Sequence, residues 1–342
     1  MAKLLMIGPK SVHVREQLEL VRDYFSEVYV VSGEIDEGFS NKELNFSLRN
    51  PIASNKTISE LRHIIQVEKP DIIHVHQANA YAYVALKAAK KTNVPVVVTA
   101  WGSDVLLVPK MGLLYRKMSQ YVINHCDYFT VDSDSMKEAI KEIRKSDGAT
   151  IINANFGVSG NSSEADREEL IYSNRNHEQL YRINYIIKAF AEFVKDSPTW
   201  KLIIGGRGSQ TDELKNLVDQ LDLNNKVHFI GFTHKSELPD LYAKARVYVS
   251  IPESDGTSIS LLEALMAGCY PVVSDLKANK EWIRDGENGR VVSGELREMF
   301  DGLADVDFEK AEDFNRELAM NRASKEVNKK KFFSLYDKML SK

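Results

Sequence analysis

Short, continuously apolar runs recur along this chain and alternate with segments of helical periodicity. In the first half the apolar runs cover residues 4–7, 27–32, 72–76, 94–99, 128–131 and 151–153. A strand that is apolar on both sides is buried on both faces, and such strands separated by helices form a parallel sheet with helices on either side. The first half is therefore predicted to be an α/β domain of this kind.

The same alternation returns in the second half, with apolar runs at residues 170–173, 202–205, 227–230, 247–250 and 271–274. Between the halves, residues 157–166 are small and polar and show no periodicity, which is typical of a linker. We predict an α/β fold of two Rossmann-like, doubly wound domains, at residues 1–158 and 167–315. A polar helix over residues 316–342 is expected to cross back to the first domain.

Two capping-box patterns predict where helices of the first domain begin. Thr57 is followed three residues later by Glu60, and Ser135 by Glu138. In such a box the hydroxyl and the carboxylate each accept a hydrogen bond from a backbone N–H at the start of the helix. We expect helices to start at these positions, the first of them ending before Pro70.

Charge and composition limit the class of protein. The 342 residues carry a net charge of −4, which argues against a dedicated nucleic-acid binder. The two cysteines form neither a disulfide framework nor a zinc pattern. No apolar run reaches the ~20 residues that span a bilayer, and residues 1–7 are too short for a signal peptide. We expect a cytoplasmic protein that meets the inner face of the membrane, if at all, peripherally.

Residues 110–117 carry the one pattern that bears on membrane contact. They mix cationic and apolar side chains in a predicted helix. Two interpretations stay open: an ordinary amphipathic helix that packs on its own domain, or a helix that rests on an anionic membrane beside a lipid-linked acceptor.

The most informative stretch is residues 250–268. An apolar strand ends at Ser250, a loop carries Asp255 and Gly256, and a helix is expected from about Thr257. The start of a helix at the carboxyl edge of a sheet binds phosphate groups through its N–H groups and its dipole. Asp255 could then hold sugar hydroxyls, and Glu263, two turns on, could reach a ribose. Alternatively, Asp255 and Gly256 form a plain turn, and Glu263 with Ser260 only caps the helix.

This stretch resembles the signature of the family-four retaining glycosyltransferases. Asp255 and Glu263 stand at the spacing of the two acidic residues of that signature, and the Ala-Leu-Met-Ala-Gly and Pro-Val-Val segments follow. The resemblance implies a GT-B fold, a donor sugar near Asp255, Gly256, Thr257, Ser258 and Ile259, and a nucleotide ribose at Glu263. The family usually has glutamate where this chain has Asp255; Glu253 lies close enough to compensate.

The resemblance extends to other donor-binding positions of the second half. It implies that Arg175 neutralises the donor diphosphate; Tyr181 stands where the family has a lysine, so we expect Arg182 to supply the second cation. Gly206 belongs to the pair Gly205-Gly206, which is similar to a glycine pair that lines the donor site of the family, and Arg207 follows it. Phe232 lies in a loop similar to the one that pairs with the nucleobase. Surface arginines and strand-end packing are the alternative interpretations.

In the first half, Gly8 and His13 lie in a loop that resembles the one that approaches donor phosphate and acceptor. His13 is expected to position the acceptor hydroxyl. Asp104 matches the aspartate of a His-Gly-x-Asp segment and is expected near the acceptor, whereas Trp101 replaces the histidine of that segment. Of the two histidines on the strand at residues 72–76, His76 is the candidate for the site and His74 for the core.

The function implied by the resemblance is retaining transfer of a sugar from a nucleotide sugar, in first place a UDP-sugar, to a saccharide or lipid-linked saccharide in polysaccharide or glycoconjugate synthesis. No metal or other cofactor is expected, since residues 132–134 are typical helix caps. The alternatives are a sugar-nucleotide epimerase of the same fold and a non-catalytic nucleotide-sugar-binding protein. A two-Rossmann dehydrogenase is disfavoured, because the loop after the first strand lacks the dinucleotide fingerprint.

Overall fold

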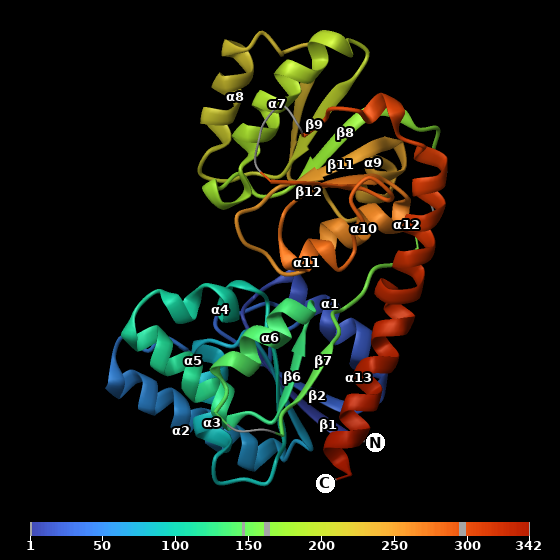
Figure 1. Cartoon of the computed structure of the whole chain (residues 1–342). Helices are drawn as coiled ribbons and strands as arrows, with labels where there is room; N and C mark the ends of the chain where they lie inside the picture. Colours follow the sequence, from blue (N-terminus) through green and yellow to red (C-terminus); the bar gives the residue numbers. More distant parts are fainter. Residues whose placement is uncertain (1, 146–147, 161–164, 294–298, 342) are drawn as a thin grey trace. The chain divides into compact units, whose positions relative to one another are not determined.

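A computed structural model of the chain describes all residues except 1, 146–147, 161–164, 294–298 and 342. The chain divides into two compact units (Figure 1), unit 1 with residues 1–157 and 325–342 and unit 2 with residues 158–324. Part of the predicted linker, residues 161–164, lies outside the described residues. Each unit is built on its own parallel sheet, so the predicted α/β class with two Rossmann-like domains is confirmed.

The sheet of unit 1 consists of parallel strands paired in the order β3-β2-β1-β4-β5-β6-β7. Their bounds are β1 (Ala2–Gly8), β2 (Phe25–Ser32), β3 (Lys42–Glu43), β4 (Ile72–His76), β5 (Val96–Thr99), β6 (Tyr128–Val131) and β7 (Thr150–Asn153). All the apolar runs of the first half are strands. The short edge strand β3 was not predicted, because two exposed charged residues carry no strand signal.

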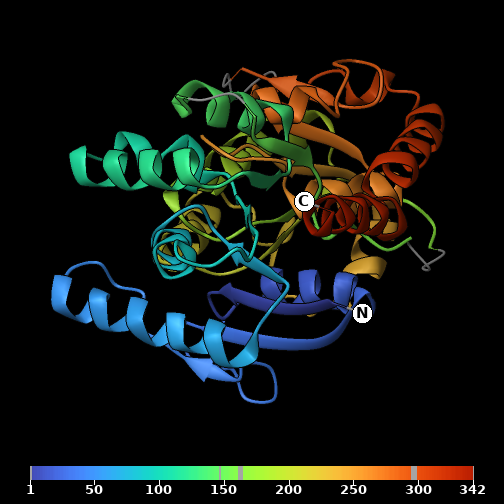
Figure 2. The ribbon, with the colours of Figure 1, turned by 90° about the horizontal axis from the view of Figure 1, so that it is seen from below.

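Helices cover both faces of this sheet. The helices of unit 1 are α1 (Val12–Val21), α2 (Pro51–Glu68), α3 (Ala80–Ala89), α4 (Ser103–Leu106), α5 (Leu113–His125), α6 (Asp134–Ile143) and α13 (Lys325–Leu340), with short 3-10 turns η1 (Arg22–Tyr24) and η2 (Val108–Lys110). Apolar side chains of α2, α3, α5 and α6 pack on one face, and those of α1 and α13 on the other. Figure 2 shows α2 and α13 on opposite sides of the strands.

Both predicted capping boxes of unit 1 are wrong. Helix α2 begins at Pro51, where the side chain of Asn50 accepts hydrogen bonds from the N–H groups of Ile52 and Ala53. Thr57 instead lies inside the helix. Helix α6 is capped by Ser133, whose hydroxyl accepts from the N–H of Met136. In both cases an earlier side chain had already satisfied the first N–H groups of the helix.

Unit 2 has a second parallel sheet in the order β10-β9-β8-β11-β12-β13. Its strands are β8 (Glu168–Asn174), β9 (Lys201–Gly205), β10 (Val227–Gly231), β11 (Ala245–Ser250), β12 (Tyr270–Ser274) and β13 (Arg290–Val292). Its helices are α7 (Ile183–Asp196), α8 (Thr211–Gln220), α9 (Leu238–Lys244), α10 (Ile259–Ala267), α11 (Lys277–Lys280) and α12 (Phe308–Ala323), with η3 (Gln179–Tyr181) and η4 (Leu303–Asp305). Helices α7 and α8 pack on one face, and α9, α10 and the end of α12 on the other.

The end of the chain differs from the expected single helix over residues 316–342. Helix α12 begins at Phe308 and ends at Ala323, and α13 runs from Lys325 to Leu340. Ser324 between them has extended backbone, with φ −60° and ψ 151°. Helix α12 therefore belongs to unit 2 and α13 to unit 1.

Candidate functional site

The predicted donor-binding residues of unit 2 lie at the carboxyl edge of its sheet. From β8 the chain proceeds to β9 and β10 on one side, and it then returns to β11, β12 and β13 on the other. The loops that follow β8 and β11 consequently diverge from two neighbouring strands. A doubly wound sheet binds its ligands at such a switch point.

Arg175 and Asp255 meet at this switch point. Arg175 follows β8, Asp255 lies in the loop between β11 and α10, and their Nη2 and Oδ2 atoms are 2.6 Å apart. Burial alone lowers the pKa of the guanidinium, but the adjacent Asp255 carboxylate more than offsets this, and the net pKa of Arg175 is raised. The ring of Tyr181 lies 4.5 Å from the guanidinium carbon. Arg175 is therefore a fixed cation beside the loop that leads into α10.

Arg182 also contacts this loop. Its Nε lies 3.1 Å from Oε1 of Glu253. Arg182 has a left-handed backbone, with φ 54°, at the junction of η3 and α7. The N–H of Glu253 donates to the carbonyl of Leu180, 2.9 Å away. The β11–α10 loop is thus held against η3, and the two predicted arginines each face an acidic residue of that loop.

Helix α10 begins at Ile259, slightly later than the expected start near Thr257. Ser258 is its cap, because its Oγ accepts a hydrogen bond from the N–H of Leu261 at 3.1 Å. Thr257 is buried, and its Oγ1 accepts a hydrogen bond from the indole N–H of Trp282 at 3.1 Å. Ser258 and not Ser260 caps the helix, so the interpretation of Glu263 as part of a capping box with Ser260 does not hold.

Glu263 is held by a neighbouring helix. The hydroxyl of Tyr242, from α9, donates to Oε2 of Glu263 at 3.2 Å. Tyr242 is buried, and its ring contacts those of Tyr172 and Tyr248. Neither Tyr242 nor Trp282 was assigned a role from the sequence. Tyr242 is a buried residue of α9 and Trp282 a buried residue of the turn after α11, and such positions give only a packing signal.

In the glycine-rich loop after β9, the backbone around Gly206 leaves no room for a side chain. Gly206 has φ +102°, and a Cβ there would lie 2.3 Å from the carbonyl oxygen of Arg175. The loop thus packs directly on the backbone that presents Arg175. Next to it, the guanidinium of Arg207 lies 5.4 Å from the ring of Phe232, which is 57% exposed. These two predicted residues form an exposed pair at the ends of β9 and β10.

The predicted residues of unit 1 gather at the carboxyl edge of the other sheet. The imidazole of His13 lies 4.9 Å from the ring of Trp101 and 5.4 Å from that of Phe156. Gly8 allows this loop to approach β4, because a Cβ would lie 2.9 Å from Val14 and 3.0 Å from His76. The edge therefore carries an aromatic cluster, with His13 exposed and Trp101 half-buried.

Asp104 is buried and organises two loops. Its Oδ2 accepts from the N–H of Ala78 at 2.7 Å, and its Oδ1 from the N–H of Trp101 at 3.0 Å. Burial raises the pKa of the carboxyl group, and these N–H groups partly counter the rise. The contacts indicate that Asp104 fixes the backbone at Trp101.

His74 and His76 are both buried, with stacked rings whose centroids are 4.9 Å apart. His74 joins α13 to the sheet, with Nδ1 2.8 Å from the Tyr336 hydroxyl and Nε2 2.6 Å from Oγ1 of Thr99. Burial lowers the pKa of His74 to about 3 and lowers that of His76 well below its ordinary value. Both imidazoles are therefore neutral near pH 7, and neither nitrogen of His76 has a hydrogen-bond partner within the described chain.

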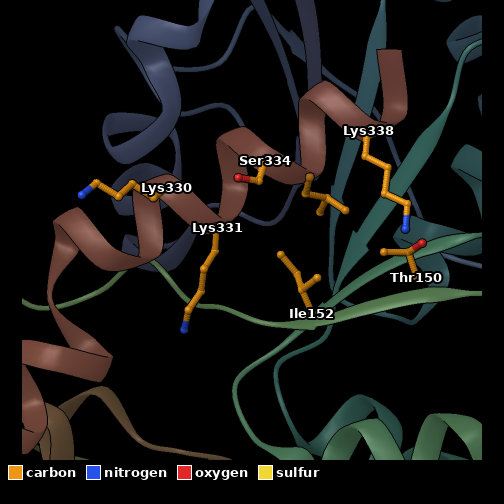
Figure 3. Close-up of a pocket in the computed structure, with 7 residues that line it drawn as sticks. Thr150, Ile152, Lys330, Lys331, Ser334 and Lys338 are labelled. Atoms are coloured by element: carbon orange, nitrogen blue, oxygen red, sulfur yellow. The ribbon is translucent and has the colours of Figure 1, made fainter. Parts of the chain in front are cut away.

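A surface groove of about 440 Å³ lies elsewhere in unit 1, between β7 and α13. Figure 3 shows its lining, with Lys338 directed toward Thr150 and Lys330 directed away. None of the predicted site residues lines it. Within the described ranges, no group of three or more histidine, cysteine, aspartate or glutamate side chains is arranged to hold a metal ion.

Comparisons with known proteins identify the family. The family described as Glycosyl transferases group 1 matches residues 133–306, and the one described as Glycosyl transferase 4-like matches residues 4–133. N-acetyl-alpha-D-glucosaminyl L-malate synthase of Bacillus anthracis is 24% identical over 254 residues, which are 68% of this chain and 63% of that protein. Phosphatidyl-myo-inositol mannosyltransferase of Mycolicibacterium smegmatis is 28% identical over 306 residues, 83% of this chain and 77% of that protein.

The fold has solved counterparts. The crystal structure of Anabaena HepE in complex with UDP-glucose superimposes with a TM-score of 0.81 at 14% identity, covering 98% of this chain and 100% of that one.

The present chain spans less than two thirds of the length of the Bacillus relative. The match of Glycosyl transferases group 1 extends over residues 133–306, more than half of the sequence. The chain therefore belongs to the group 1 glycosyl transferases and has their GT-B fold.

Proposed function

We propose that this protein transfers a sugar from a UDP-sugar to a saccharide, free or lipid-linked, with retention of anomeric configuration. One observation carries the proposal. Asp255 holds Arg175 as a cation at the switch point of the unit 2 sheet, next to the loop that leads into α10. A fixed guanidinium beside a helix N-terminus suits a diphosphate, which carries the charge that both groups bind.

In this proposal the diphosphate lies at the start of α10, with Arg175 and Arg182 as its cations. Asp255, Gly256, Thr257, Ser258 and Ile259 border the donor sugar. Glu263, oriented by Tyr242, accepts hydrogen bonds from ribose hydroxyls. Gly206, Arg207 and Phe232 border the nucleotide. The UDP-glucose named with Anabaena HepE supports uridine as the base.

The chemical step breaks the bond between the anomeric carbon and the phosphate oxygen. The electron pair of this bond stays on the diphosphate. A new bond forms from the acceptor hydroxyl oxygen to the anomeric carbon, and the hydroxyl proton passes to the departing diphosphate. The two guanidinium groups and the N–H groups of α10 stabilise the charge that develops on the leaving group. Retention rests on the resemblance to the family-four retaining enzymes. In unit 1, Gly8 borders the donor phosphate, His13 borders the acceptor, and Asp104 keeps Trp101 in place.

The acceptor is proposed only at the level of its chemical class. The name of the Mycolicibacterium relative, phosphatidyl-myo-inositol mannosyltransferase, specifies a lipid acceptor, which supports a lipid-linked saccharide. We propose that the protein works at the cytoplasmic side of a membrane, in polysaccharide or glycoconjugate synthesis. No described helix has the length and apolar character that crossing a membrane requires. We further propose that transfer needs no metal; activity unchanged in EDTA would support this.

A thermal-shift panel of UDP-, GDP- and ADP-sugars tests the donor site, because a ligand that binds only the folded state raises the melting temperature. We expect UDP-sugars to give the largest rise. Glu263→Ala should abolish it, whereas Glu213→Ala, at an exposed position of α8, should leave it unchanged. No response to any nucleotide would contradict the proposal. An isomerised sugar nucleotide in an acceptor-free incubation would indicate an epimerase instead.

A further inference from the structure

Residues 110–117, here called the α5 tip, are eight consecutive exposed residues of unit 1. Four of them are large and apolar: Met111 is 64% exposed, Leu113 75%, Leu114 83% and Tyr115 48%. In the described part of the chain, no other stretch of five residues exposes more than two large apolar side chains. Single exposed apolar residues are ordinary on a protein surface, whereas a cluster marks an interaction site.

The rest of α5 holds this cluster away from the core. Toward its carboxyl end the helix buries Ser119, Val122 and Ile123. At its amino end Gly112 has φ +143°, and a Cβ there would have no atom within 4 Å. The apolar side chains are thus presented by an anchored helix, so they do not fold back onto unit 1.

The charge of the α5 tip indicates what covers it. Lys110, Arg116 and Lys117 lie among the apolar residues, and no aspartate or glutamate occurs between Asp104 and Asp127. The chain as a whole has a net charge of −4, so this segment is a local reversal of sign. An anionic bilayer surface satisfies both features, because apolar side chains enter the boundary of the acyl chains while cations stay among the lipid headgroups.

We infer that the α5 tip inserts into the surface of an anionic membrane. The proposed function then gains a narrower acceptor, a lipid-linked saccharide and not a free one; this second step rests on the proposed function. The membrane contact itself does not, because it concerns unit 1, whereas the nucleotide response belongs to unit 2.

Co-sedimentation of the full chain with vesicles tests the contact. We expect binding to phosphatidylcholine vesicles that contain phosphatidylglycerol, weaker binding at high salt, and little binding to phosphatidylcholine alone. Replacing Lys110, Arg116 and Lys117 by glutamine should weaken binding to the anionic vesicles by about fivefold per cation. The double variant L113S/L114S should weaken binding by about 100-fold, since the transfer of two leucine side chains from water into the apolar part of the membrane is lost.

Matched controls separate the α5 tip from general surface effects. The double variant I52S/V67S removes two apolar side chains of α2 that are 82% and 58% exposed, and it should bind vesicles like the parent. Replacing the exposed Lys42, Lys90 and Lys91 by glutamine removes the same number of charges from unit 1 and should have a smaller effect than the change in the α5 tip. All variants should keep the melting temperature and the response to UDP-sugars, since the altered side chains are exposed.

A spectroscopic variant reports insertion directly. In Y115W, anionic vesicles should shift the added tryptophan emission to the blue relative to the parent chain. Absence of binding to anionic vesicles, or equal loss in L113S/L114S and I52S/V67S, would overturn the inference. So would a dimer in solution that L113S/L114S dissociates, because the α5 tip would then be an interface between copies. Vesicle binding without any response to nucleotides would support the membrane contact and contradict the proposed UDP-sugar donor.

Discussion

The two units have similar sheets, yet their carboxyl edges differ in chemistry. In unit 2 the edge carries Arg175 and Arg182, each paired with an acidic residue of one loop, beside the nine-residue helix α10. In unit 1 the edge carries His13 and Trp101, and the helix that follows β5, α4, has only four residues. The first edge suits an anion and the second a neutral, hydroxyl-bearing ligand. In the proposed function, the same fold therefore supplies two kinds of site through the residues placed after its strands.

The largest effect is expected from Arg175→Ala. Removing a fixed cation from the leaving group should lower the transfer rate by roughly 100- to 1000-fold. Arg284→Ala, an exposed arginine of unit 2, is the matched control and should change the rate little. Both are measured as kcat/KM with a UDP-sugar. If His13→Ala in unit 1 cost more than Arg175→Ala, the division into an anionic and a neutral site would be wrong.

Gly206→Ala tests whether the glycine loop of unit 2 is needed to present Arg175. The change adds a Cβ 2.3 Å from the carbonyl oxygen of Arg175, at a φ of +102°. We expect it to destabilise the protein by about 3 kcal/mol. Gly286→Ala has φ +78° but no atom within 4 Å, so it should cost only about 1 kcal/mol of conformational strain. Equal losses in urea unfolding would show that steric contact with Arg175 is not the cause.

Acid should affect unit 1 through its buried histidines. Burial lowers the pKa of His74 to about 3, so the folded state keeps this imidazole neutral while the unfolded state protonates it below about 6.5. Its contribution to stability is complete above that value and is lost as the pH falls toward 3. At pH 5 the loss from His74 alone is roughly 2 kcal/mol.

Hydrogen exchange at pH 7 and pH 5 follows each unit separately. His76→Gln should flatten the acid dependence of unit 1, because the pKa of His76 is also lowered by burial. His63→Gln, on an exposed position of α2, should leave it unchanged. An acid dependence confined to unit 2 would contradict the assignment to these histidines.

Tyr242→Phe is expected to have the smallest effect. It removes the hydroxyl that donates to Glu263, so the KM for the donor should rise about fivefold with little change in kcat. The discrimination between UDP and 2′-deoxy-UDP should fall in parallel, which a merely structural change would not produce. Tyr270→Phe, whose hydroxyl donates to the carbonyl of Gly289, is the matched control in the same unit.

Much of the fold could be predicted because its signals are local. Every predicted apolar run is a strand, since burial on both faces requires an unbroken run of apolar residues. Helix starts were predicted less well. Asn50 and Ser133 cap α2 and α6, and not Thr57 and Ser135, because several side chains in a short stretch can satisfy the same N–H groups. The edge strand β3 could not be predicted, because its two residues pair only through the backbone.

The order of elements around the candidate site could be predicted, but the contacts between its side chains could not. Residues 250–268 indicated a strand, an acidic loop and a helix, and that order holds with the helix beginning at Ile259. The ion pairs could not be predicted, since Arg175 and Asp255 are 80 positions apart. Similarly, the role of Tyr242 depends on the packing of α9 against α10, for which the sequence contains no signal.

The sequence by itself determined the number of sheets, their strands except the edge strands β3 and β13, and the family. Apolar periodicity and the signature around Asp255 and Glu263 are written in consecutive residues. Only the tertiary structure decided which charges pair, which serine caps α10 and which apolar residues of α5 remain exposed. The physical reason is the same in each case. Strand order and helix packing bring distant side chains within contact distance, and contact energies depend on distances that spacing along the chain does not fix.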